Sequence, residues 1–414
     1  MPGPPTWEVL HKWEANLPQH DLDLPFPEGR TGRYVKFSNQ NKGLGWNNCL
    51  NEELMNLHLS YLSDRAYVFS PFIWASHHYP WPASQWSSLP ASTPFGPTTP
   101  LNALVAGPLA GGPWSPGDPA PRSVSADWWD IVCPVAERFT LNTTSIKPFL
   151  GDLPGNEVLA AWDTAAARCV EVIPPDFDVD PLPQTFDLWI WGSERVLSLW
   201  EGFRSSPASV LLGPSPVVEG ALARNSYLWA PRARVHAGAK AYDPPARMLA
   251  VHVRRGDYIA HCPNLAAWGS SYYGWAQLAS LPDHFRRGAD DTEEALRHCL
   301  PTAAQFAERI AVARDEYVGA GGGRVVDILY LLTNEEGEWL DELLAAVRVQ
   351  GWATVATSRD LVLDPEQEEV GMAVDMEIAR RAAVFLGNGW SSFTSNVVHQ
   401  RLVDGKEPIS IRMT

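Results

Sequence analysis

Short apolar segments that end in polar clusters restrict the fold of this 414-residue sequence more than any other feature. Residues 248–253 (Met-Leu-Ala-Val-His-Val) have the length and side chains of a buried strand, and Arg254, Arg255 and Asp257 follow at once. Residues 325–332 and 382–388 repeat the arrangement: the polar pair Thr333 and Asn334 follows the first, and a small-residue turn rich in hydroxyls follows the second. Polar side chains at the carboxyl ends of parallel strands are typical of ligand sites in open α/β sheets.

Helical patterns separate these strands and predict a doubly wound parallel sheet. They cover residues 292–317, 335–349 and 366–381, and a further helix is expected to begin after the turn at Gly389. In the N-terminal half, we predict helices at 48–64 and 192–203 and strands at 66–74, 130–135 and 168–173. The fold class expected from these patterns is α/β.

The chain is too long for one ordinary hydrophobic core, so we expect two domains. We place their boundary near residue 235, which gives an N-terminal domain at 1–235 and a C-terminal domain at 236–414. Residues 80–122 are rich in Pro, Gly and Ser and are expected to form a long surface excursion, either an acceptor-side lid or a plain insertion.

The polar clusters have the chemistry of a phosphate site. An arginine can hold a phosphate through two parallel, charge-assisted hydrogen bonds, and Arg254 and Arg255 offer two such side chains. Ser391 and Ser392 stand where a helix would begin, and a helix N-terminus presents free backbone N–H groups and a partial positive charge to an anion. The sequence therefore predicts a phosphate-bearing substrate.

These segments resemble the donor-binding motifs of the GDP-fucose-dependent protein O-fucosyltransferases and their relatives. The resemblance rests on His252-Val-Arg-Arg-Gly-Asp257, on Leu332-Thr-Asn334, and on Asp375 followed by Phe385-Leu-Gly-Asn388 and Ser391-Ser-Phe-Thr394. Near the start of the chain, Lys42-Gly-Leu-Gly-Trp-Asn-Asn48 resembles the glycine-rich loop of that family.

The resemblance implies two Rossmann-like domains facing a cleft (a GT-B-like fold) and metal-independent, inverting transfer of fucose from GDP-fucose, with no cofactor. It makes Arg254 the catalytic residue, in contact with the β-phosphate. The implied donor-binding residues are Gly43, Leu44, Gly45, Trp46, Asn47, His252, Val253, Arg254, Arg255, Asp257, Thr333, Asn334, Asp375, Ser391, Ser392, Phe393 and Thr394.

Individual roles follow from the same resemblance. His252 and Asp257 would position Arg254, Ser392 to Thr394 would hold the diphosphate, and Asp375 would bind the base or ribose. The loop glycines would approach the fucose and phosphates, since they lack a side chain. Trp46 would either stack on the ligand or brace the loop, Phe393 could instead be a core side chain, and Asp375 a helix-surface carboxylate.

One departure from the family concerns the general base. One branch carries a glutamate between the two loop glycines, where this sequence has Leu44. His261, Glu52 and Asp257 are alternatives, and another branch relies on arginine with no obvious protein base. The acceptor is then a protein Ser or Thr or a glycan hydroxyl. The alternatives are a transferase that uses another nucleotide sugar and an inactive nucleotide- or glycan-binding module.

Composition excludes one class of partner. The net charge is −16, which argues against a nucleic-acid binder that works by neutralising phosphates. The overlapping Asp-x-Asp triplets of Asp176-Phe-Asp178-Val-Asp180 resemble the metal motif of another glycosyltransferase class, but prolines flank them and we expect no metal site.

Five cysteines permit zero, one or two disulfides and show no zinc spacing. Asn142-Thr-Thr144 is a glycosylation sequon, which matters only in a luminal protein. We find neither a signal peptide nor an apolar run long enough to span a membrane, so a membrane anchor requires an upstream segment absent from this sequence. The family resemblance implies the secretory pathway.

Overall fold

The structure is a computed structural model that describes residues 3–40, 43–88, 96–162, 167–175, 182–229, 245–285 and 292–414. The chain forms two compact units. The first comprises Met1–Trp191, Arg195–Glu219 and Leu363–Ala373, and the second comprises Gly192–Glu194, Gly220–Val362 and Val374–Thr414. The boundary predicted near residue 235 lies outside the described residues.

The second unit is built on a five-stranded sheet with the order β12-β11-β10-β13-β14, in which every pair is parallel. Its strands are β10 (Met248–Val253), β11 (Ile328–Thr333), β12 (Thr354–Thr357), β13 (Val384–Gly387) and β14 (Ile411–Met413). The chain winds outward from β10 in one direction through β11 and β12, and then in the other through β13 and β14. The order therefore reverses between β10 and β13, and this switch point is where such sheets bind ligands.

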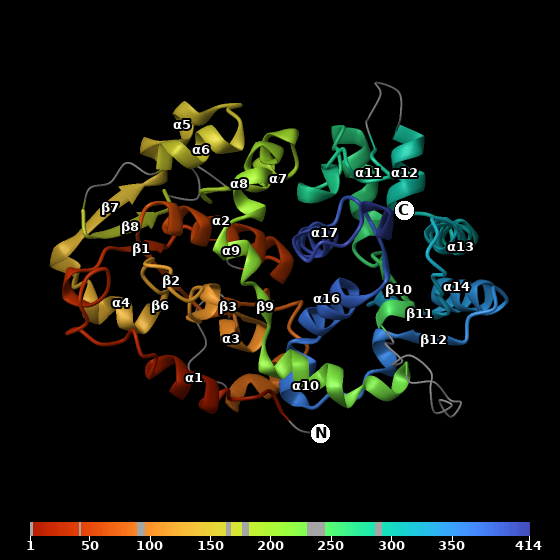
Figure 1. Ribbon diagram of the computed structural model, residues 1–414, viewed down its shortest axis with the longest axis horizontal. Coiled ribbons are helices and arrows are strands. Elements are labelled where there is room, and N and C mark those ends of the chain that lie inside the picture. Colours follow the sequence, from red (N-terminus) through yellow and green to blue (C-terminus); the bar gives the residue numbers. More distant parts are fainter. Residues whose placement is uncertain are drawn as a thin grey trace. The chain divides into compact units, whose positions relative to one another are not determined.

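Helices cover both faces of this sheet (Figure 1). On one face lie α13 (Ala303–Gly319) and α14 (Glu338–Arg348), and on the other lie α16 (Gly371–Arg381) and α17 (Ser392–Val403). Alternate β10 side chains, among them Leu249 and Val251, join Phe306 of α13 and Leu343 of α14 in one apolar cluster. Because successive strand residues point to opposite faces, His252 points to the face covered by α17.

The first unit contains a second five-stranded parallel sheet, with the order β6-β2-β1-β8-β7. Its strands are β1 (Tyr34–Phe37), β2 (Ala66–Phe69), β6 (Val124–Ser125), β7 (Arg138–Asn142) and β8 (Cys169–Ile173). The long helix α2 (Trp46–Leu62) contacts β2, and α4 (Ala126–Val132) contacts β2 and β6. The α/β class and the two Rossmann-like domains are confirmed; the cleft between them stays a prediction.

The remaining helices and strands are short. The α-helices are α1 (Glu8–Ala15), α3 (Leu101–Leu104), α5 (Lys147–Leu150), α6 (Gly155–Trp162), α7 (Leu188–Trp191), α8 (Trp200–Arg204), α9 (Pro207–Val210), α10 (Pro216–Arg224), α11 (Tyr258–Trp268), α12 (Thr292–Cys299) and α15 (Pro365–Glu369). The strands are β3 (Phe72–Ile73), β4 (Thr98–Thr99), β5 (Val105–Ala106) and β9 (Gly213–Pro214).

The segment Leu363–Ala373 belongs to the first unit although the chain on both sides of it belongs to the second. Glu369, at the end of α15, is fully buried and accepts hydrogen bonds from three side chains: Trp7 Nε1 at 2.9 Å, the Tyr79 hydroxyl at 2.8 Å and the Thr99 hydroxyl. Burial raises the pKa of this carboxyl, and the three donors oppose that rise. The donors come from distant parts of the chain, so Glu369 fixes this returning segment in the first unit.

Several predicted elements differ in the structure. The helix expected at 192–203 is a 3-10 helix at Glu194–Leu199 followed by the short α8, and the strand expected at 66–74 is divided into β2 and β3. The strand expected at 130–135 is wrong: α4 ends there, and it begins because the Ser125 hydroxyl accepts a hydrogen bond from Trp128 N. The helix expected at 292–317 is divided into α12 and α13, since Pro301 interrupts it and Thr302 restarts it with a capping box. The helix expected at 366–381 is likewise divided into α15 and α16.

The surface excursion expected at 80–122 is also wrong over much of its length. Leu101, Leu104 and Val105 are buried, and so are Leu109 and Ala110. Prolines and glycines prevent long helices or strands here, but they do not prevent burial, because the apolar side chains between them pack into the first unit.

Each unit carries one disulfide. Cys133 is bonded to Cys169 in the first unit and Cys262 to Cys299 in the second, while Cys49 is buried and forms no disulfide. The sequence permits zero, one or two disulfides, and the structure has two.

Candidate functional site

The carboxyl end of β10 and the first turn of α17 meet at the switch point of the second unit. His252 Nδ1 lies 3.2 Å from the Thr394 hydroxyl, and the His252 ring lies 4.4 Å from the ring of Phe393. All three residues are buried. Burial, together with the positive charge of Arg254, lowers the pKa of His252 to about 3. This histidine is therefore neutral at physiological pH and acts through hydrogen bonding rather than charge.

Arg254 is the first residue after β10, and two neighbours hold its guanidinium group. Nη2 donates to Asp257 Oδ2 at 2.8 Å, and the guanidinium carbon lies 5.0 Å from the centroid of the Tyr258 ring. The Arg254 Nε is buried and has no hydrogen-bond partner in the described part of the chain. About a third of the side chain is exposed, so an oriented cation with unused donors remains open to an anion.

Tyr258 is a residue that the sequence reasoning missed. It begins α11, it is buried, and its hydroxyl donates to the carbonyl oxygen of Trp390 at 3.1 Å. The same side chain therefore contacts Arg254, after β10, and the turn that follows β13. An aromatic residue four positions after the arginine, at the start of a helix, was the signal that could have identified it.

The turn after β13 leads directly into α17. Ser391 is the N-cap, and its side chain makes no capping hydrogen bond. The N–H groups of the first turn, from Ser392 onward, have no intrahelical acceptor and carry the positive end of the helix dipole. Gly389 is required in this turn, because a Cβ there would lie 2.3 Å from the Tyr272 ring. A helix N-terminus that follows a strand at a switch point is an anion-binding arrangement.

Asp375 lies in α16, on the same face of the sheet. Its Oδ1 accepts a hydrogen bond from the Tyr330 hydroxyl at 2.8 Å, and its Oδ2 accepts one from the Ser358 hydroxyl at 2.7 Å. Burial raises the pKa of Asp375 to about 6, although both hydrogen bonds oppose the rise. The Ser358 hydroxyl also accepts a hydrogen bond from Thr333 N at 3.0 Å. Asp375 is thus tied to the middle of β11 and to the residue that follows β12, and it is not a helix-surface carboxylate.

The two adjacent arginines have different surroundings. The Arg255 guanidinium lies 4.6 Å from the centroid of the Trp339 ring, and Trp339 belongs to α14 on the opposite face of the sheet from α17. The Thr333 hydroxyl donates to Val253 O at 3.2 Å, and Asn334 lies beside Gly256. The structure therefore groups Val253, Thr333 and Asn334 with Arg254 at the strand ends and directs Arg255 elsewhere.

The predicted glycine-rich loop lies in the first unit, before α2. Gly43 has a φ of 74°, which favours glycine, and its N–H donates to Ile73 O at 3.3 Å. Leu44 O accepts a hydrogen bond from the Cys49 thiol at 3.9 Å, and Gly45 is the N-cap of α2. Trp46 is buried against Phe72, with ring centroids 5.3 Å apart. Of its two predicted roles, the structure supports bracing the loop; Asn47 follows it in the first turn of α2.

None of the three candidate bases stands out. Glu52 is buried in the first unit, Asp257 is paired with Arg254, and His261 lies with its ring centroid 5.5 Å from that of Tyr258. The base stays unassigned.

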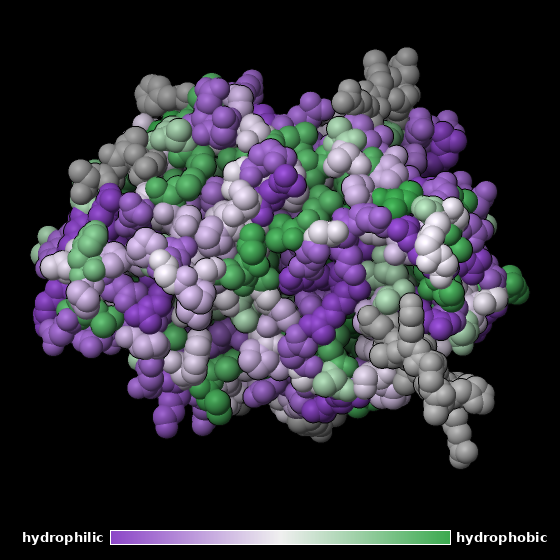
Figure 2. Space-filling view, viewed as in Figure 1, coloured by the Kyte–Doolittle hydropathy of each residue, from purple (hydrophilic) through white to green (hydrophobic). Residues whose placement is uncertain are grey.

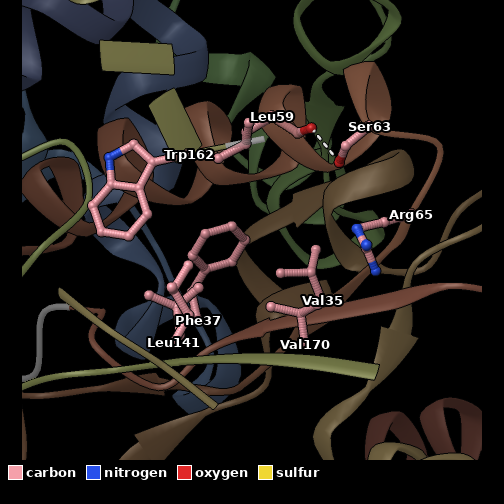
Figure 3. A pocket seen from close by; sticks show the side chains of 9 residues that line it. Val35, Phe37, Leu59, Ser63, Arg65, Leu141, Trp162 and Val170 are labelled. Atoms are coloured by element: carbon pink, nitrogen blue, oxygen red, sulfur yellow. Dashed lines mark hydrogen bonds between the residues drawn. The ribbon is translucent and has the colours of Figure 1, made fainter. Parts of the chain in front are cut away.

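The first unit also encloses a small apolar cavity (Figure 3). Side chains from β1, β7 and β8, from α2 and α6, and from the turn between α2 and β2 line it: Val35, Phe37, Leu59, Ser63, Arg65, Leu141, Trp162, Val170 and Val172. The Ser63 hydroxyl donates to Leu59 O at 2.8 Å, and Arg65 donates to Ala167 O at 2.9 Å. Because its polar groups are turned to the backbone, the cavity is a gap in the packing of the core and not a reaction site.

Two further findings concern only the described ranges. They contain no group of three or more His, Cys, Asp or Glu side chains arranged to hold a metal ion. The Asp176 to Asp180 segment lies outside them. No helix within these ranges is both long and apolar enough to cross a bilayer.

Comparison with known proteins gives similarity in fold only. No protein-family model matches the sequence, and no curated protein matches it. Among solved structures, the chain is similar to POFUT1 in complex with GDP-fucose, with 16% identity and a TM-score of 0.49, over 89% of this chain and 94% of that one. It is also similar to an Arabidopsis thaliana FUT1 mutant in complex with GDP (9% identity, TM-score 0.39, 95% of this chain and 73% of that one). A third is NodZ alpha-1,6-fucosyltransferase soaked with GDP-fucose (11% identity, TM-score 0.38, 88% and 91%).

Proposed function

We propose that this protein is an inverting glycosyltransferase that transfers fucose from GDP-fucose to a hydroxyl of a protein or glycan. The observation that carries the proposal is the contact between His252 and Thr394. It joins the end of β10 to the N-terminus of α17 at a topological switch point, with Arg254 next to it. An arginine and a helix N-terminus at one strand edge form a site for a diphosphate.

The mechanism follows from the charge that develops during transfer. As the bond between fucose C1 and the β-phosphate oxygen breaks, the sugar becomes positive and the diphosphate gains negative charge. Arg254 and the first-turn N–H groups of α17, at Ser392 to Thr394, would stabilise the leaving diphosphate. Tyr258 and Asp257 would hold the Arg254 guanidinium in place before the reaction, so that little reorganisation is needed when the bond breaks.

Neutral His252 would contribute orientation. Through Thr394, it holds the first turn of α17 against the end of β10. Asp375, supported by Tyr330 and Ser358, would contact the base or ribose. The loop from Gly43 to Asn47 is proposed as a further donor contact, and fucose as the sugar rests on the motif resemblance.

The proposal requires no metal, because Arg254 and the helix N-terminus supply the positive charge. Titration calorimetry with GDP, UDP and CDP in EDTA, repeated with excess Mn²⁺, tests it. We expect GDP to bind tightest and binding to be indifferent to Mn²⁺. GDP release from GDP-fucose in the presence of candidate acceptors then tests transfer.

The other outcomes point to the alternatives. A preference for UDP, or a requirement for Mn²⁺, would replace the proposal with a transferase that uses the Asp176 to Asp180 segment. GDP binding without any fucose transfer would favour the inactive nucleotide-binding module, and the absence of any nucleotide binding would favour glycan recognition alone.

A further inference from the structure

We propose that Asn142 in the first unit is a site of N-glycosylation when the chain folds in an oxidising lumen. Asn142 opens the triplet Asn142-Thr143-Thr144, the acceptor pattern for N-linked glycans. Such triplets arise often by chance, so the proposal rests on how the fold presents this one.

The triplet forms a tight turn that brings its two functional side chains together. Asn142 is the last residue of β7, and its Oδ1 accepts hydrogen bonds from Thr144 N at 2.9 Å and from the Thr144 hydroxyl at 2.7 Å. The oxygen of the Asn142 amide is therefore engaged, and its nitrogen makes no hydrogen bond within the described ranges. The nitrogen is the atom that a glycan must reach.

The exposure of the residues in this turn also leaves Asn142 open to modification. Thr143, the middle residue, is fully buried and anchors the turn. Thr144 and Ser145 are exposed, and Asn142 is partly exposed. A glycan on Asn142 can thus extend into solvent without disturbing the residue that fixes the turn.

The triplet also lies at the margin of the sheet. In the order β6-β2-β1-β8-β7, strand β7 is at the edge and pairs only with β8 among the described strands. Exposed edge strands invite pairing with other chains, and proteins commonly cover them. Phe139 of β7 and Val135 just before it are exposed apolar side chains. Figure 2 shows hydrophobic residues among hydrophilic ones over the part of the surface where Figure 1 labels β7.

A second, independent observation concerns the compartment. Disulfides persist in oxidising compartments. The structure has two disulfides, one in each unit. Cys169 lies opposite Arg138 in the β7–β8 ladder, so the Cys133–Cys169 bond secures the start of the strand that ends at Asn142. The Cys133–Cys169 disulfide and the sequon therefore lie at the same edge of the sheet. Disulfide formation and N-glycosylation require the same compartment.

The modification is a group transfer from an oligosaccharide carried on a lipid pyrophosphate. The Asn142 amide nitrogen attacks C1 of the first sugar, the C1–N bond forms, and the bond from C1 to the pyrophosphate oxygen breaks. The lipid pyrophosphate leaves with the electron pair of that bond, and the amide nitrogen gives up one proton to solvent.

The experiment directs the full chain to the secretory pathway of eukaryotic cells by a cleavable signal peptide, with a C-terminal tag that carries an unrelated sequon. Only chains modified on the tag are analysed, so every chain examined has met the glycosylation machinery. Peptide mass spectrometry before and after peptide N-glycanase then reads Asn142 directly. We expect most chains to carry a glycan there.

Matched variants separate the sequon from its surroundings. Asn142→Gln and Thr144→Ala should lose the glycan, and Thr144→Ser, which keeps the hydroxyl, should retain it. Ser145→Ala is the control: Ser145 is exposed and outside the triplet, and its hydroxyl donates to Asn142 O at 2.6 Å. An unmodified Asn142 in chains with a modified tag would overturn the proposal.

A second readout tests whether the glycan covers the edge strand. Glycosylated protein should stay monodisperse in light scattering at concentrations where the Asn142→Gln protein associates. GDP affinity measured on the same two proteins should be equal, since Asn142 lies in neither the switch-point site nor the glycine-rich loop. Failure of the proposed fucosyltransferase function would leave the glycan result intact, and the reverse also holds.

Discussion

Substitution of the two adjacent arginines offers the sharpest test of the switch-point site. Arg254 and Arg255 have the same charge and adjacent positions, but Arg254 is held by Asp257 and Tyr258 whereas Arg255 lies over Trp339. Any assay that responds only to local charge would treat the two alike. An assay of leaving-group stabilisation should separate them.

We expect Arg254→Ala to lower kcat roughly a hundredfold to a thousandfold, because removing one preorganised donor to a developing anion costs about 3–4 kcal/mol of transition-state stabilisation. The cost to folding should be much smaller. The Arg254 and Asp257 side chains are 30% and 55% exposed, so their ion pair contributes about 1 kcal/mol or less to stability. Arg255→Ala should lower kcat less than about tenfold, since its loss removes a stacking contact on Trp339 worth about 1 kcal/mol.

The assay is GDP release from GDP-fucose, with GDP-fucose affinity measured by calorimetry and unfolding followed by urea titration. Arg254→Ala should lose far more in kcat than in GDP-fucose affinity, because the diphosphate gains negative charge only as the bond to fucose C1 breaks. Equal losses in the two variants would refute the assignment of Arg254, as would an Arg254→Ala enzyme within tenfold of the wild type.

Three further predictions follow from the same region. Tyr258→Leu should lower kcat by up to about thirtyfold, because it removes about 0.5–2 kcal/mol of cation–π interaction with Arg254. Tyr258→Phe keeps the ring and should keep most of the activity. Equal losses of kcat in the two variants would exclude a positioning role for the ring. Asp375 has a folded-state pKa of about 6, above its ordinary value of 3.8, so its stabilising effect is complete below about pH 4 and is lost as the pH rises through 6. Asp375→Asn should therefore gain stability relative to wild type between pH 4 and 7 in urea titrations, and a difference independent of pH would contradict the burial argument. Replacing Cys262 and Cys299 with Ser should lower the free energy of unfolding by about 2–4 kcal/mol, and a reductant should then have less effect on the variant's unfolding midpoint than on the wild type's.

Local sequence patterns predicted the elements that carry the site. The apolar segments became β10, β11 and β13, and the hydroxyl-rich turn after Gly389 became the start of α17. These predictions succeed because a short, fully buried strand in a parallel sheet needs a continuous apolar run, and because serine is a residue type preferred at helix N-caps, where Ser391 stands. Arg254 and Thr394 lie at the ends of such elements, and the chain order alone put them at one sheet edge.

The sequence misled where long-range packing overrode local character. Residues 130–135 have the apolar character of a strand, yet α4 ends there because Ser125 caps it. Residues 98–110 have the composition of a surface loop, yet their apolar side chains complete the first unit's core. Composition gives only the average preference of a segment for helix, strand or surface, and tertiary contacts decide which of these the segment adopts.

By itself, the sequence determined the α/β class, the presence of two domains, the strands and helix start at the switch point, and the residues that we propose for anion binding. Only the tertiary structure decided that Arg254 and Arg255 diverge, that Tyr258 contacts Arg254, that Asp375 is tied to Tyr330 and Ser358, and that Cys133 pairs with Cys169. The physical reason is distance along the chain. Strand and helix propensities act within a few residues, whereas the direction of a side chain after a strand, and its partners, depend on segments that folding brings from far away.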